Sequence, residues 1–134
     1  MKITIEQDIP DHRISDLLCG AFEGGSNYWY QIEEFIKPVN FDNTDPENRR
    51  IRHLSYPQNE GGALIISTVV ADGEPEYGEE LKTYRLDLEA LSRGLRLMSI
   101  NYPRHYRDFL TENDDADTSD VFLQCCLFGK TIYG

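Results

Sequence analysis

Residues 63–70 read ALIISTVV, and this stretch decides the fold. Most of its side chains branch at Cβ, and such side chains favour an extended backbone. The apolar run is nearly continuous, which is typical of a strand covered on both faces. Gly61-Gly62 precede it, and Asp72-Gly73 form a turn signal after it. The sequence therefore predicts a central, doubly covered strand.

Shorter strand-like segments lie on either side of this central strand. The aromatic-rich residues 26–36 should place Tyr28, Tyr30 and Ile32 on one face and Trp29 on the other. Polar stretches rich in Asn, Asp, Pro and Gly separate the segments and indicate loops. Further short strands are expected at residues 2–6, 51–56, 81–86 and 131–133.

Four segments repeat apolar side chains at every third or fourth position, which indicates amphipathic helices. They are residues 12–23, 88–100, 103–110 and 119–128. We expect Asp11 and Asp87 to cap the first two helices, because an aspartate can accept hydrogen bonds from free N–H groups. Pro103 suits the first turn of the third helix.

The order of these elements is a helix, then strands, then helices, with hairpin-like connections between strands. This order favours an α+β fold over one that alternates strands with helices. We expect a mostly antiparallel sheet with three to four helices packed on it as a single pair of layers. At 134 residues the chain fits one domain, residues 1–134, with one core.

The chain is strongly acidic, with a formal net charge of −11. This charge repels bare nucleic acid and anionic membranes, and it favours cationic partners. DNA-binding clefts of other proteins are cationic, so nucleic-acid mimicry is one hypothesis. Two basic patches, Arg49-Arg50-Arg52 and Arg104-His105-Arg107, would either contact a phosphate or pair with surplus carboxylates.

The cysteines indicate a reducing compartment. Cys19, Cys125 and Cys126 are odd in number and lie in apolar patterns, which is typical of buried, reduced thiols. The first residues are too short and polar for a signal peptide, and no stretch is long and apolar enough to span a membrane. We therefore expect a cytoplasmic protein.

Glu23-Gly24-Gly25-Ser26-Asn27-Tyr28-Trp29 joins the first helix to the aromatic strand. Gly24 or Gly25 is expected to end the helix in a left-handed conformation. Such a turn exposes backbone N–H groups to an anion or a ribose, and the aromatic rings can stack on a base. The alternative is that the rings only fill the two faces of the sheet.

The acidic run of residues 113–120 does not fit a calcium loop, which needs glycine at its sixth position and glutamate at its twelfth. We expect Asp117, Thr118 or Ser119 to cap the last helix instead, with nearby carboxylates favoured at its N-terminus. Gly129 should end that helix. A carboxylate cluster here would hold Mg²⁺ only if a bound phosphate supplied further ligands.

Catalytic signatures are weak. His12, His53 and His105 are scattered, so no zinc site is expected, and no nucleophile elbow is present. We therefore expect a binding protein rather than an enzyme, with no cofactor and no resident metal. A Mg²⁺-dependent hydrolase that uses Glu23 with Asp115 or Asp117 remains a second alternative.

The turn around Gly24-Gly25 and the tail from Asn113 to Gln124, with Phe128-Gly129 and Tyr133-Gly134, resemble a group of small, uncharacterised proteins. Bacteriophages and other mobile elements carry this group, and the resemblance covers nearly the whole chain. It implies a phage accessory protein in a bacterial host cell, of the kind that counters host defence. The resemblance implies no particular functional residue.

The leading hypothesis is a non-catalytic accessory protein that binds a nucleotide-like small molecule or a host defence protein. The alternative is an acidic mimic of nucleic acid that inhibits a host nuclease or methyltransferase. An edge strand at residues 131–133 would also allow a homo-oligomer. The candidate binding surface consists of Glu23, Gly24, Gly25, Asn27, Tyr28, Trp29, Asp115, Asp117, Thr118, Asp120 and Gln124.

Overall fold

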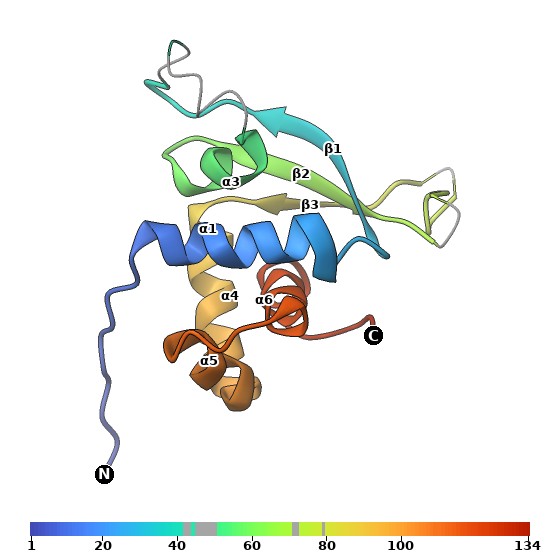
Figure 1. Cartoon of the computed structure of the whole chain (residues 1–134). Coiled ribbons are helices and arrows are strands. Elements are labelled where there is room, and N and C mark those ends of the chain that lie inside the picture. Colours follow the sequence, from blue (N-terminus) through green and yellow to red (C-terminus); the bar gives the residue numbers. More distant parts are fainter. Residues whose placement is uncertain (42–43, 45–50, 71–72, 79) are drawn as a thin grey trace.

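The computed structural model describes residues 1–41, 44, 51–70, 73–78 and 80–134. Arg49, Arg50 and Asp72, which belong to an expected basic patch and an expected turn, lie outside these residues. In chain order, the elements are α1 (Asp11–Gly20), the π-helical turn η1 (Ala21–Gly25), β1 (Tyr30–Ile36), α3 (Arg52–Ser55), the 3₁₀ turn η2 (Tyr56–Gln58), β2 (Ala63–Thr68), β3 (Thr83–Leu86), α4 (Leu88–Asn101), α5 (Pro103–Leu110) and α6 (Ala116–Phe128) (Figure 1).

The sheet has three antiparallel strands in the order β1-β2-β3. Its central strand, β2, is the one predicted from residues 63–70, and all six of its residues are buried or half-buried. The strand β1 pairs Tyr30 with Thr68 and Ile36 with Ala63, with a bulge between Ile32 and Glu34. The α+β fold with an antiparallel sheet is therefore confirmed.

The helical elements contact the sheet through β2 and β3: η2 packs against β2, and α4 and α6 pack against β3. α1 runs below the strands in Figure 1, and α4, α5 and α6 lie further below. α6 is the central helix, because it packs against α1, η1, α4, α5 and β3. Nine of its thirteen residues are buried, so α6 has almost no solvent-facing side. A helix covered on so many sides has to satisfy its polar side chains within the protein.

The helix ends largely follow the sequence pattern. Asp87 caps α4 by accepting a hydrogen bond from the Ala90 backbone, and α5 has the predicted bounds. Gly129 ends α6 in a left-handed conformation. The N-cap prediction for α6 was wrong: Asp115 caps the helix, in a reciprocal capping box with Thr118. The run of carboxylates and hydroxyls offered several chemically similar caps, so residue type alone did not select one.

Three predicted strands are absent from the described structure. Residues 52–55 form the short helix α3, which continues into η2 where Pro57 supplies a helix-compatible φ. Residues 1–10 form no strand: Ile3 and Ile5 are exposed, whereas Ile9 packs against the core. Residues 131–133 are held by a side chain of α6 and pair with no strand.

The first helix ends differently from the prediction. Pro10, not Asp11, occupies the N-cap position, and no side chain caps α1. At its other end the chain widens into η1, and neither Gly24 nor Gly25 has a positive φ. Gly25 is required for another reason: a Cβ atom there would lie 2.2 Å from the Ala116 carbonyl oxygen. A glycine therefore lets η1 approach the backbone at the start of α6.

A pair of substitutions tests this close approach. Gly25→Ala should lower the free energy of unfolding by about 1–3 kcal/mol, because a backbone atom cannot move aside for the new methyl group. Gly24→Ala is the matched control, since no atom lies within 4 Å of its would-be Cβ. It should leave stability unchanged or raise it by about 0.4–1 kcal/mol. Urea denaturation measures both, and equal losses would contradict the close-approach explanation.

Candidate functional site

The two segments singled out in the sequence meet in space, and Asp120 on α6 joins them. Its Oδ1 atom accepts hydrogen bonds from the Ser26 hydroxyl at 2.8 Å and from the Trp29 indole N–H at 2.7 Å. Its Oδ2 atom accepts a third from the Tyr28 hydroxyl at 2.6 Å. All three donors belong to the turn after η1. One carboxylate therefore fixes that turn against the buried helix.

One helical turn further along α6, Gln124 fixes the tail. Its Oε1 atom accepts from the backbone N–H groups of Ile132 and Tyr133 at 2.7 and 2.9 Å, and its Nε2 atom donates to the Tyr133 carbonyl at 3.2 Å. The Tyr133 ring stacks on Trp29 with 5.5 Å between centroids and 10° between planes. Asp120 and Gln124 thus hold two distant parts of the chain side by side.

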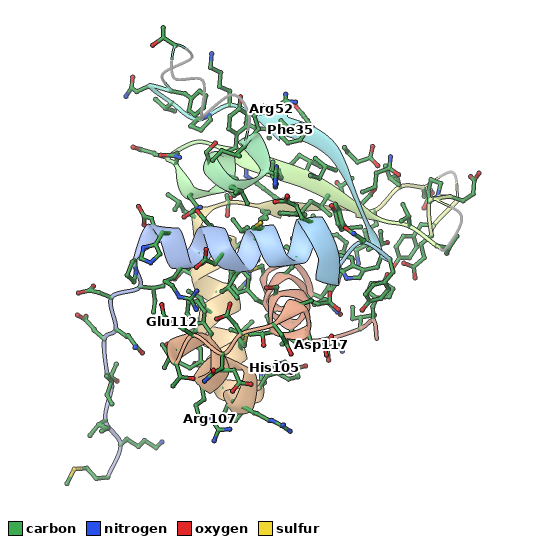
Figure 2. The ribbon with its side chains drawn as sticks, viewed as in Figure 1. Phe35, Arg52, His105, Arg107, Glu112 and Asp117 are labelled. Carbon is green, nitrogen blue, oxygen red and sulfur yellow. The ribbon has the colours of Figure 1, made fainter. Side chains whose placement is uncertain are left out.

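Between these parts lies an open cavity of about 590 Å³, which we call the tyrosine cavity. The turn, α5, α6 and the tail all contribute to its wall. Figure 2 labels His105 of α5 and Asp117 of α6, which both face this region. The wall is made of Gly25, Tyr28, Tyr102, His105, Asp117, Asp120, Val121, Gln124, Thr131, Tyr133 and Gly134.

The wall of the tyrosine cavity is negatively charged and aromatic. Asp117 is exposed and Asp120 is buried, and His105 is the one basic side chain among the described residues of the wall. His105 Nδ1 lies 3.1 Å from the Thr118 hydroxyl. Desolvation, followed by the hydrogen bond to Asp120, raises the pKa of Tyr28 well above its usual value of 10. At neutral pH Tyr28 therefore keeps the proton that it donates to Asp120.

A second depression, the acidic hollow, is lined by α1, η1 and the start of α6. It has a volume of about 490 Å³ and contains Glu23 and Asp115, together with Asp16, Asp114 and Cys19. Glu23 and Asp115 therefore line one hollow, as the hydrolase alternative requires, whereas Asp117 lines the tyrosine cavity.

Most carboxylates of the acidic hollow already have partners. Glu23 accepts from the Cys19 thiol at 2.9 Å and lies 3.3 Å from His53 Nε2, and these contacts lower its pKa. Asp115 accepts from the Thr118 backbone, which lowers its pKa in turn. Within the described residues, no three His, Cys, Asp or Glu side chains are arranged to hold a metal ion.

The same contacts make Cys19 a poor nucleophile. The hydrogen bond to Glu23, with burial second, raises the pKa of its thiol to about 11. Burial raises the pKa of Cys125 to about 11, and burial, with the neighbouring Cys125 second, raises the pKa of Cys126 well above 9. Because the thiolate is the reactive form, all three cysteines are inert thiols at neutral pH.

The structure brings only some of the predicted site residues to the tyrosine cavity. Trp29 is only 1% exposed, so its ring belongs to the core and has no free face for a base. Thr118 is buried in the capping box, and Asn27 and Gly24 are exposed outside the tyrosine cavity. The members that do line this cavity are Gly25, Tyr28, Asp117, Asp120 and Gln124.

Sequence reasoning missed two tyrosines of the cavity wall, Tyr102 and Tyr133. The Tyr102 hydroxyl, just before α5, accepts from the Thr131 backbone N–H at 2.9 Å. Tyr133 was assigned to an edge strand, although it lines the cavity. The expected basic patch of α5 contributes only His105, because Arg104 and Arg107 are exposed outside the wall, and Arg107 points away from Asp117 in Figure 2.

Comparison with known proteins finds no matching family model, no matching curated protein and no matching solved structure. In the described part of the chain, no helix combines the length and the apolar character needed to cross a bilayer. Function therefore has to be inferred from the chemistry of the tyrosine cavity.

Substitution of Asp120 tests its role as the shared acceptor. Asp120→Asn should lower the free energy of unfolding by about 2–4 kcal/mol. The three donors would lose a charged acceptor, and the new amide N–H₂ group cannot accept a hydrogen bond from any of them. The indole N–H resonance of Trp29 should shift, and its hydrogen exchange should accelerate. Asp117→Asn, on the exposed side of the same helix, should cost less than about 1 kcal/mol. Equal losses for the two variants would show that the three bonds contribute little.

The raised pKa values predict a loss of stability in alkali. Burial, with the Glu76 hydrogen bond second, raises the pKa of Tyr133 from 10 to about 12, and that of Cys125 rises from 9 to about 11. Between pH 9 and 12 the unfolded chain therefore releases protons that the folded chain keeps, so the stability falls as pH rises. Denaturant titrations from pH 7 to 11 under reducing conditions measure this fall. A flat profile above pH 10 would contradict it, and Tyr133→Phe should reduce the slope.

Proposed function

We propose that this protein is a non-catalytic accessory protein of a bacteriophage or mobile element, which binds a host protein in the bacterial cytoplasm through the tyrosine cavity. The observation that supports it best is the convergence of the two distinctive sequence segments on one cavity. Hydrogen bonds to Asp120 and Gln124 hold its walls together, and a pre-formed wall lowers the entropic cost of binding. A counter-defence role would follow if the host protein belongs to a defence system.

Binding fits the chemistry of the described residues better than catalysis does. The thiols are held protonated, and Glu23, Asp114 and Asp115 are engaged in internal hydrogen bonds or ion pairs. A hydrolase of the proposed kind needs free carboxylates that share a metal ion. Glu23 and Asp115 line the same hollow, so the hydrolase alternative fits their positions. Their existing hydrogen bonds disfavour it.

A host protein suits the cavity better than a nucleotide does. Phosphate groups would approach Asp117 and Asp120 in a chain of net charge −11, and like charges repel. Trp29 is buried and offers no stacking face. A nucleic-acid mimic needs carboxylates spaced along one face, as phosphates are along a duplex. In the described structure, several carboxylates instead gather in two depressions, the acidic hollow and the tyrosine cavity.

Site-specific photo-crosslinking tests the proposal with two matched positions. Tyr28 is 47% exposed and Leu88 is 48% exposed, but Tyr28 lines the tyrosine cavity, whereas Leu88 begins α4 and does not line it. A photoreactive phenylalanine at position 28 should capture a discrete host protein in phage-infected bacterial cells. The same probe at position 88 should not capture it, because Leu88 is not part of the proposed binding surface. An excess of untagged wild-type chain should remove the crosslink.

Melting curves of both variants establish that the probes leave the fold intact. Capture of the same proteins in equal yield at both positions would contradict binding through the cavity. A panel of linear and cyclic nucleotides supplies the competing outcome. A nucleotide that raises the melting temperature and shifts the Tyr28 resonances would replace the host protein with a nucleotide ligand.

A further inference from the structure

Asp120 is a buried charge without a counter-ion. Its side chain belongs to a residue that is only 9% exposed, and its three donors are the neutral groups of Ser26, Tyr28 and Trp29. No Lys, Arg or His in the described part of the chain forms an ion pair with it. Buried charges in proteins are usually paired, because neutral hydrogen bonds replace only part of the lost hydration. A cationic group of a binding partner would supply the counter-ion that the described residues do not provide.

The carboxylate is accessible to such a cation from one direction, because Asp120 lines the tyrosine cavity. A carboxylate has about four lone-pair sites. Oδ1 uses two of them on Ser26 and Trp29, and Oδ2 uses one on Tyr28. Oδ2 therefore retains capacity for one more donor.

The rest of the wall has the chemistry of a cation site. Tyr28 is 47% exposed, and Tyr102 and Tyr133 are half-buried, so tyrosine rings line several sides of the cavity. Aromatic faces attract cations, most strongly where water is partly excluded. Asp117 adds a second, exposed carboxylate at the same cavity. Arg104 and Arg107, the cations of neighbouring α5, do not belong to the wall and leave it free.

We propose that the tyrosine cavity binds an arginine side chain of the partner protein, with the guanidinium group between the tyrosine rings and the carboxylates of Asp117 and Asp120. This inference rests on the proposed function and names the group that the site recognises. An arginine suits the site better than a lysine, because the guanidinium is planar, weakly hydrated and able to stack on rings while it donates to two carboxylates. An ammonium group is a compact charge that holds its water more strongly.

Three small probes of similar length separate charge from shape: the N-acetyl methylamides of arginine, lysine and citrulline. Citrulline keeps the planar end group but carries no charge. The arginine probe should shift the amide resonances of Tyr28 and Asp117 and the indole N–H of Trp29 in ¹⁵N-labelled full-length chain. We expect a dissociation constant on the order of a millimolar. Lysine should bind several-fold more weakly, and citrulline should leave the spectrum unchanged.

Two variants that remove one charge each complete the test. Asp117→Asn should weaken the arginine probe about tenfold, since a charged acceptor becomes neutral. Glu89→Gln is the matched control, because Glu89 is also exposed in the first turn of a helix, α4, but does not line the tyrosine cavity. It should bind as the wild type does. Equal weakening in both variants would reduce the effect to net charge and overturn a specific site.

The outcomes separate this inference from the proposed function. If citrulline binds as well as arginine, or if no probe shifts the cavity resonances while crosslinking at position 28 succeeds, the partner is bound but arginine recognition is wrong. If a nucleotide shifts the same resonances instead, both the arginine proposal and the host-protein proposal are wrong. If neither probes nor crosslinking reach the cavity, the proposed function fails with the inference.

Discussion

The carboxylate of Asp120 is the constraint on which the rest of the structure depends. It takes three hydrogen bonds from the turn that joins η1 to β1, so it sets where the sheet begins relative to the central helix. Trp29, held by one of these bonds, packs against Phe128 and stacks on Tyr133. The position of the tail therefore depends on the same carboxylate, although Gln124 supplies its hydrogen bonds.

The cavity follows from this arrangement. α6 has neighbours on most sides. The turn after η1 and the C-terminal tail both pack against it, and the tyrosine cavity is the space between them. Because the turn contributes hydroxyl and indole donors, the central charge is hydrogen-bonded but not neutralised. Within the described residues no Lys, Arg or His forms an ion pair with this carboxylate. The wall therefore keeps the negative charge on which the proposed arginine recognition depends.

The sequence predicted those helices and strands whose formation depends on side chains within the same segment. The periodic leucines of α4, Pro103 at the start of α5 and the β-branched run of β2 each determine their own segment. The bonds of Asp120 reach 91 to 94 residues along the chain, so no local pattern could identify the partners. The same limit explains Gly25, since its requirement comes from Ala116 and not from its own φ.

The distance between the turn and its acceptor also affects how the chain folds during synthesis. Ser26 and Trp29 leave the ribosome some ninety residues before Asp120 does, because these bonds span 94 and 91 positions. Until then the aromatic turn has no acceptor, and the sheet has no α6 to cover it. Most proteins of this size fold as one cooperative unit. The nascent N-terminal half therefore exposes the aromatic side chains of this turn until α6 has been synthesised, and exposed apolar surface of this kind promotes aggregation.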